Sequence, residues 1–332
     1  MIDNFKTMLS DYNPKDNSSL WQEVEDEKLP AHKTKYIRKF YNKKFNKNRY
    51  PLKLHLIANE KTEKLSLNIS GSIKKWYFQE NSRRDLNADE FVDCIKLLAE
   101  ELSIDYETLL NGKVTKLEVG LTVTLKPEMR NITDCFVKYR NAKRIIRGET
   151  SLYFKFENYE LVFYDKFLEM QKNKIWTENH QKVFDRFHFL RFEIRVNKVS
   201  GTNFKGNFDT IEKLITNWNK LPLIIENNIK AINFVDLISK EENVEINNYS
   251  DFVNHFTFLG IKDYGIQESI NLFDKEIESS NKTKMLNKFL DIYRSNITNE
   301  SDPKAKLLLE VRKKLSRLYN KSNIKYNNNV LN

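Results

Sequence analysis

Three segments far apart in the chain show the alternation of polar and apolar residues that is typical of β-strands. They are residues 114–125, 161–170 and 187–196. Because successive side chains of a strand point to opposite faces, the polarity of each face can be read position by position. In the first segment, Glu118 falls on the polar face. The opposite, apolar face consists of Leu117, Val119, Leu121 and Val123.

The other two segments place reactive side chains on one face each. Alternation puts Tyr164 and Lys166 on the same side of the second segment. In the third segment Arg191, Glu193 and Arg195 form a charged row opposite apolar residues. A carboxylate, a tyrosine with a lysine, and an arginine–glutamate–arginine row together suit metal-assisted attack on a phosphodiester.

The composition indicates a folded, basic protein. A length of 332 residues exceeds the usual size of one domain, and 40% hydrophobic residues are enough for a sizeable core. The net charge of +10 favours a polyanionic partner, since lysines and arginines that neutralise phosphates release counterions. A basic protein that binds no nucleic acid is the alternative.

Cysteine usage and hydropathy favour a cytoplasmic protein without a membrane partner. Cys94 and Cys135 are the only cysteines and do not form a Cys-x-x-Cys pair, so neither a disulfide framework nor a thiolate zinc site is expected. No apolar run approaches the ~20 residues that span a bilayer. The first residues lack the basic start and apolar stretch of a signal peptide.

Residues 32–50 interleave basic and aromatic side chains. Lys39, Lys43 and Lys44 lie in this stretch, together with several tyrosines and phenylalanines. Basic residues can follow a nucleic-acid backbone while aromatic rings stack on bases, which makes these lysines candidate DNA contacts. The alternative is a solvated basic face whose rings anchor it to the core.

The pattern divides the chain into four parts and predicts an α+β fold. A basic segment (1–50) precedes a nicking domain (51–200) with a largely antiparallel sheet and flanking helices; a mainly helical C-terminal region (208–320) and a tail expected to be disordered (321–332) follow. Residues 52–59 and 64–70 predict a hairpin, and Asn87 with Glu90 predicts a capping box that opens a helix. Helical spacing predicts further helices over residues 208–218, 223–238, 285–293 and 304–318.

Four short motifs carry a resemblance to a known family. They are GSIKKW (71–76) with Asn81 downstream, TKLEV (115–119), VFYDKFLE (162–169) and LRFEIR (190–195). In this order they resemble the rolling-circle replication initiators of the filamentous-phage gene II/X type, which are related to plasmid initiators of the Rep-trans group. The resemblance covers residues 50–200 and does not extend to the helical C-terminal third.

The resemblance implies site residues. Tyr164 would be the nucleophile that becomes joined to a DNA 5′-phosphate, and Glu118 and Glu193 would hold a divalent metal. The histidine–hydrophobe–histidine motif of other initiators is missing, because the run from His55 to Ile57 has only one histidine. Candidate DNA contacts in the motifs are Lys74, Lys75 and Arg195.

The chemistry of these residue types supports the assignment. A phenol with a pKa near 10 is a poor nucleophile at neutral pH, so Lys166 is expected to favour the phenolate of Tyr164. Mg²⁺ or Mn²⁺ prefers oxygen ligands, and Arg191 and Arg195 could hold phosphate oxygens bidentately. The alternative for Glu193 is a surface ion pair with its neighbouring arginines, and for Glu118 a plain solvent-facing position.

The expected function is DNA nicking and strand joining that initiates rolling-circle replication of a phage or plasmid in a bacterial host. No G-x-x-x-x-G-K-[ST] loop is present, so a host helicase and a host DNA polymerase are the expected partners. A conjugative or mobilisation relaxase would use the same chemistry. A non-catalytic DNA-binding regulator is the alternative outside the enzymes.

Overall fold

The computed structural model describes most of the chain. The described residues are 1–10, 12, 21–27, 29–42, 44, 49–80, 83–148, 151–173, 178–236, 246–297 and 302–320. Lys43, the motif residue Asn81 and the tail 321–332 lie outside them.

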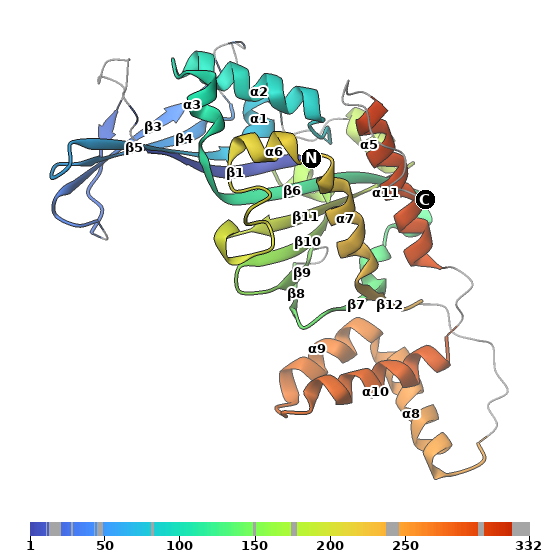
Figure 1. Ribbon diagram of the computed structural model, residues 1–332. Helices are drawn as coiled ribbons and strands as arrows, with labels where there is room; N and C mark the ends of the chain where they lie inside the picture. The colour runs from blue at the N-terminus through green and yellow to red at the C-terminus, as the bar shows by residue number, and fades with distance from the viewer. Residues whose placement is uncertain are drawn as a thin grey trace.

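The described residues form a ten-stranded antiparallel sheet with helices packed against it (Figure 1). The strand order is β2-β3-β4-β5-β1-β6-β11-β10-β9-β8. The predicted α+β class with a mainly helical C-terminal region is therefore confirmed. The strands are β1 (Ile2–Leu9), β2 (Gln22–Glu23), β3 (Lys33–Phe40), β4 (Leu52–Asn59), β5 (Lys64–Ser72), β6 (Lys113–Leu125), β8 (Lys143–Arg147), β9 (Ser151–Lys155), β10 (Tyr159–Asp165) and β11 (His188–Val196). A second sheet pairs β7 (Phe136–Tyr139) with β12 (Ile232–Phe234).

The first strand lies in the middle of the large sheet. β1 pairs with β5 on one side and with β6 on the other. Phe5, Thr7 and Leu9 are buried at alternate positions, as expected for a strand with one face on the core. In the sequence, residues 1–50 are distinguished by their basic charge. In the structure they contribute β1, β2 and β3 to the same sheet as residues 51–200.

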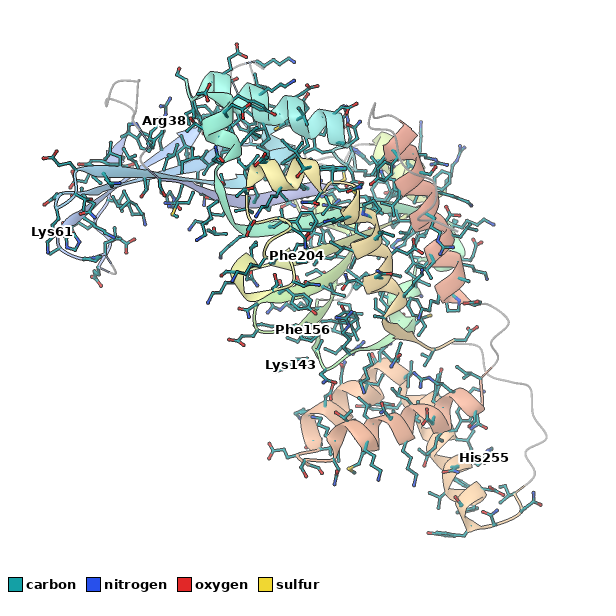
Figure 2. The ribbon with its side chains drawn as sticks, in the orientation of Figure 1. Arg38, Lys61, Lys143, Phe156, Phe204 and His255 are labelled. Atoms are coloured by element: carbon teal, nitrogen blue, oxygen red, sulfur yellow. The ribbon has the colours of Figure 1, made fainter. Side chains whose placement is uncertain are left out.

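Short-range signals predict the next elements correctly. β4 and β5 form the expected hairpin, and Figure 2 shows Lys61 at its outer end. The predicted capping box is present at the start of α2 (Ala88–Glu101). The side-chain Oδ1 of Asn87 accepts from the backbone N–H of Glu90, and the Glu90 carboxylate accepts from the backbone N–H of Asn87. With α1 (Ile73–Phe78) and α3 (Tyr106–Leu110), α2 lies on one side of the strands (Figure 1).

The strand predicted over residues 161–170 is wrong in its second half. β10 ends at Asp165, and α4 (Lys166–Lys172) follows directly. The Asp165 carboxylate caps this helix by accepting from the amides of Phe167 and Leu168, which ends the strand. Tyr164 and Lys166 therefore do not share a strand face.

The remaining helices form two groups. α5 (Glu178–Phe184), α6 (Ile211–Thr216), α7 (Lys220–Lys230) and α11 (Pro303–Asn320) accompany the sheet, whereas α8 (Tyr249–Tyr264), α9 (Ile266–Glu276) and α10 (Lys282–Ser295) pack on one another beside it (Figure 1). Short 3-10 helices cover Pro127–Met129, Ile132–Cys135 and Val199–Gly201. Across the described ranges, every helix is too short or too polar to cross a membrane.

Four of these helices match the predicted ones. The helix predicted over 223–238 is too long, because α7 ends at Lys230 and β12 follows. Helices α8 and α9 have no counterpart in the prediction.

We expect Asn87→Ala to lower the free energy of unfolding by about 1 kcal/mol, because it leaves the backbone N–H of Glu90 without its side-chain acceptor. Urea denaturation followed by circular dichroism measures the change. Lys96→Ala, on the exposed face of the same helix, is the control and should leave the midpoint nearly unchanged. Equal stability of both variants would contradict a stabilising role of the cap.

Candidate functional site

Four adjacent strands bring the candidate site residues together. Asp3 is on β1, Glu118 on β6, Glu193 on β11 and Tyr164 on β10, in the order in which these strands lie in the sheet. In the register, Glu118 lies opposite Arg195, and Tyr164 lies opposite Arg191. Directly opposed residues share a face, so Glu118, Glu193 and Tyr164 lie on the same side of the sheet.

Three carboxylates form an acidic triad that could hold a metal ion. Asp3, Glu118 and Glu193 each offer one oxygen, and these oxygens lie within 4.8 Å of one another. Hard divalent cations such as Mg²⁺ and Mn²⁺ prefer such an all-oxygen donor set. The donor chemistry therefore fits the expected metal, with Asp3 added to the two predicted ligands.

Glu118 is a carboxyl group whose charged form is disfavoured by its surroundings. Burial, followed by the nearby carboxylates of Glu193 and Asp3, raises the pKa of Glu118 to about 8. Its nearest cation is Arg195, whose Nε lies 3.7 Å from Glu118 Oε2. A carboxylate crowded by like charges in this way favours either a proton or a metal ion.

Tyr164 faces a cavity and contacts the triad. Its hydroxyl donates to Glu193 Oε1 at 2.8 Å. The side chain lines a cavity of about 720 Å³ together with the triad, Lys75 and Lys166. Burial and the neighbouring Glu193 carboxylate raise the pKa of Tyr164 well above its usual value. The phenol is therefore protonated at neutral pH in this arrangement.

Lys166 does not act on Tyr164 as expected. It is the first residue of α4, is buried, and its Nζ donates to Glu169 at 2.7 Å. The pKa of Tyr164 is raised rather than lowered, and its causes are burial and the Glu193 carboxylate. The expectation that Lys166 stabilises the phenolate is thus wrong for this geometry, because the helix start turns its side chain toward Glu169.

Arg191 is a buried structural cation. Its guanidinium contacts Asp3 at 2.7 Å, Asp85 at 2.5 Å and Glu193 at 3.0 Å, and it also donates to Thr122. It has 1% of its surface exposed. The expected contact of Arg191 with a phosphate does not fit, since its nitrogens are already engaged and shielded from the cavity. Arg191 instead holds two of the triad carboxylates in place.

Asp85 extends this ion-pair cluster to the last helix. It is buried, accepts from the Thr122 amide at 3.0 Å, and lies 3.1 Å from the Nζ of Lys314 on α11. The cations Arg191 and Lys314 lower the pKa of Asp85. A side chain from α11 therefore contacts the same network that holds the triad.

Arg195 and Glu193 form a partly buried pair rather than a surface one. Arg195 donates to Glu193 Oε2 at 2.9 and 2.6 Å, and Glu193 itself has 1% of its surface exposed. The surface alternative for Glu193 is therefore wrong. Arg195 lines the cavity, where its accessible side can meet a ligand.

The predicted DNA-binding lysines differ in burial. Lys74 is buried with its Nζ 3.0 Å from Asp3, so its expected contact with DNA is wrong. Lys75 is half-buried and lines the cavity, while Lys39 and Lys44 are exposed.

Sequence reasoning missed Asp3, Asp85 and Gly120. In the alternation of β1, Asp3 falls on the same face as the buried residues that follow it. A carboxylate on that face was the signal available in the sequence. A shift in the β1–β6 register between Ile2 and Phe5 lets Asp3 and Asn4 both contact site residues. For Asp85 the sequence carries no comparable signal.

Comparison of the chain with protein-family models, curated proteins and solved structures gave no significant match.

We expect Gly120→Ala to unfold or strongly destabilise the protein, by about 3 kcal/mol or more. A Cβ at this position would lie less than 3 Å from the guanidinium of Arg191, whose three carboxylate partners prevent it from moving aside. Thermal and urea denaturation measure the loss. Gly260→Ala is the matched control: it meets open space on α8 and should be neutral or slightly stabilising. Similar stability of the two variants would contradict the close packing of the Arg191 guanidinium against Gly120.

We expect Mn²⁺ affinity to rise about tenfold per pH unit up to pH 8 and then to level off. Binding must displace the proton that Glu118 holds below its raised pKa, so low pH weakens binding. Isothermal titration calorimetry between pH 6 and pH 9 measures this slope. Glu118→Gln removes the titrating group and should leave weak binding with little pH dependence. A flat profile for the unaltered protein would argue against Glu118 as a ligand.

Proposed function

We propose that this protein nicks and rejoins single-stranded DNA through Tyr164 and a divalent metal ion, as an initiator of rolling-circle replication. One observation carries the proposal: the Tyr164 hydroxyl is hydrogen-bonded to a carboxylate of the acidic triad at the wall of an open cavity. A nucleophile and a candidate metal site are thus within one hydrogen bond of each other.

Each residue of the site has its own role in the proposed reaction. Asp3, Glu118 and Glu193 would hold Mg²⁺ or Mn²⁺, which supplies charge stabilisation at the phosphate and its leaving oxygen. Glu193 orients the phenol through their hydrogen bond, and Arg191 fixes Glu193. Arg195 and Lys75 line the cavity and provide positive charge for the phosphate oxygens.

In the proposed step, the Tyr164 oxygen forms a bond to phosphorus as the bond from phosphorus to the 3′-oxygen breaks. The phenolic proton leaves along its hydrogen bond to Glu193 and passes to water in the cavity. The 3′-oxygen takes up a proton and becomes a free hydroxyl. The phosphodiester is exchanged for a tyrosyl phosphodiester, so reversal by a 3′-hydroxyl rejoins the strand without an energy source.

The site geometry supports an enzyme over a DNA-binding regulator, because a regulator has no need of a phenol hydrogen-bonded to an acidic triad. A relaxase would use the same chemistry, and the sequence of the DNA that is nicked would distinguish it from a replication initiator.

We expect wild-type protein with Mn²⁺ and a labelled single-stranded origin oligonucleotide to form a covalent protein–DNA adduct, and Tyr164→Phe to form none. Denaturing gel electrophoresis detects the adduct. Tyr153→Phe is the matched control, because Tyr153 lines the same cavity from β9 and should retain activity. Glu118→Gln should lose the adduct and keep most DNA binding.

An adduct that persists in Tyr164→Phe would reject this nucleophile. Binding without any adduct in the wild-type protein would favour the regulator.

A further inference from the structure

A row of lysines crosses the sheet on the face that carries the candidate site. Lys39 on β3 lies opposite Lys53 on β4, and Lys53 lies opposite Ser70 on β5. Ser70 in turn lies opposite Lys6 on β1, which lies opposite Lys116 on β6. Because opposed residues in antiparallel strands share a face, the four lysines form one line across five strands. We name these four residues the lysine row.

The lysine row spans four strand intervals, which corresponds to roughly 19 Å at ~4.8 Å per interval. Its inner end meets the candidate site, since Lys116 and Glu118 are two positions apart on one face of β6. Asn4, two positions from Lys6 on β1, donates to Glu118 Oε2. The row therefore leads directly to the acidic triad.

The lysine row has no carboxylate partner in the part of the chain that the structure describes. Lys39, Lys53 and Lys116 are exposed and Lys6 is half-exposed, and among the described residues none of them forms an ion pair. His55 on β4 lies near this row. Burial, followed by the positive charges of Lys35, Lys6 and Lys53, lowers the pKa of His55.

A hollow joins the lysine row to the site. A cavity of about 340 Å³ is lined by Lys6, Ser70 and Lys116 and also by Glu118 and Arg195. The larger cavity at Tyr164 is lined by Glu118 and Arg195 as well. The two cavities thus meet at these shared residues, and a chain-like ligand could extend from one into the other.

We propose that the lysine row and the smaller cavity bind the backbone of a single nucleic-acid strand that leads to Tyr164. This inference builds on the proposed function and adds the path of the substrate.

A single line of cations matches the phosphates of one strand. A duplex carries phosphates on both sides of a groove ~12 Å wide, and one line of lysines that ends in a small cavity does not match it. The row alternates with the buried residues Phe5, Leu54 and Leu117, so it lies on the face opposite the apolar core. The helices α2 and α3 contribute to that core and lie on one side of these strands in Figure 1.

The test is the binding of a fluorescent oligothymidylate to the full chain, measured by anisotropy at several salt concentrations in the Tyr164→Phe background. The triple variant Lys6→Ala/Lys53→Ala/Lys116→Ala should bind roughly 100-fold more weakly at 0.1 M salt. Its salt slope should fall by about 2, since each phosphate contact with a single strand contributes about 0.7.

The control is Lys96→Ala/Lys205→Ala/Lys262→Ala, which removes the same charge from exposed positions outside the row. It should retain nearly all of the affinity. If both triple variants lose equal affinity, the effect is one of net charge and the lysine row is not a binding path. A larger loss for a duplex than for the single strand would likewise overturn the proposal. Circular dichroism verifies that each variant is folded.

The outcome is separable from that of the proposed function. If the protein forms no covalent adduct but the triple lysine variant shows the selective loss of single-strand binding, the lysine row is supported and the nicking mechanism is rejected. If the protein forms the adduct, and the triple lysine variant with Tyr164 intact binds and nicks normally, the nicking mechanism is supported and the lysine row is rejected.

Discussion

The buried guanidinium of Arg191 is the interaction on which the rest of the site depends. It connects β11 to β1 through Asp3 and to the segment before α2 through Asp85, and it contacts Glu193 on its own strand. A buried cation is tolerated only when carboxylates surround it, and removing one partner of such a pair typically costs 3–5 kcal/mol. The same contacts hold two acidic side chains close together, although their charges repel each other. Gly120 completes the arrangement, since a side chain there would occupy the space of the guanidinium.

The site combines two ionised carboxylates with a carboxyl group that holds its proton at neutral pH. Asp3 and Glu193 are held ionised by arginine and lysine neighbours, which lower the pKa of both carboxyl groups despite their burial. The pKa of the nearby Glu118 is raised instead, because this carboxyl group is buried beside the carboxylates of Glu193 and Asp3. This contrast between neighbouring carboxyl groups is typical of functional sites, where charge is arranged for a ligand rather than for stability. The phenol of Tyr164 is hydrogen-bonded at this boundary and open to the cavity.

Local patterns predicted much of the fold, and long-range contacts account for the rest. The alternation in 114–125 and 187–196 identified β6 and β11, and it placed Glu118 and Glu193 on faces that the sheet brings together. The hairpin β4–β5 and the cap at Asn87 also follow from neighbouring residues. The place of Asp3 could not be predicted, because it depends on β1 pairing with strands about 70 and 115 positions away. The burial of Lys74 and Arg191 depends on carboxylates distant in sequence. Helix α8 was missed because Tyr249 and Phe256 on its surface blur the one-sided apolar pattern.

The contact between Lys314 and Asp85 links the site to a distant helix. Asp85 precedes α2 whereas Lys314 lies on α11, so the contact joins parts of the chain that are far apart in the sequence. Until α11 packs against β6 and α7, Asp85 has only part of its compensating charge. Separation of α11 from the sheet would therefore leave Asp85 with less compensating charge, which couples this helix to the ion pairs that hold the acidic triad.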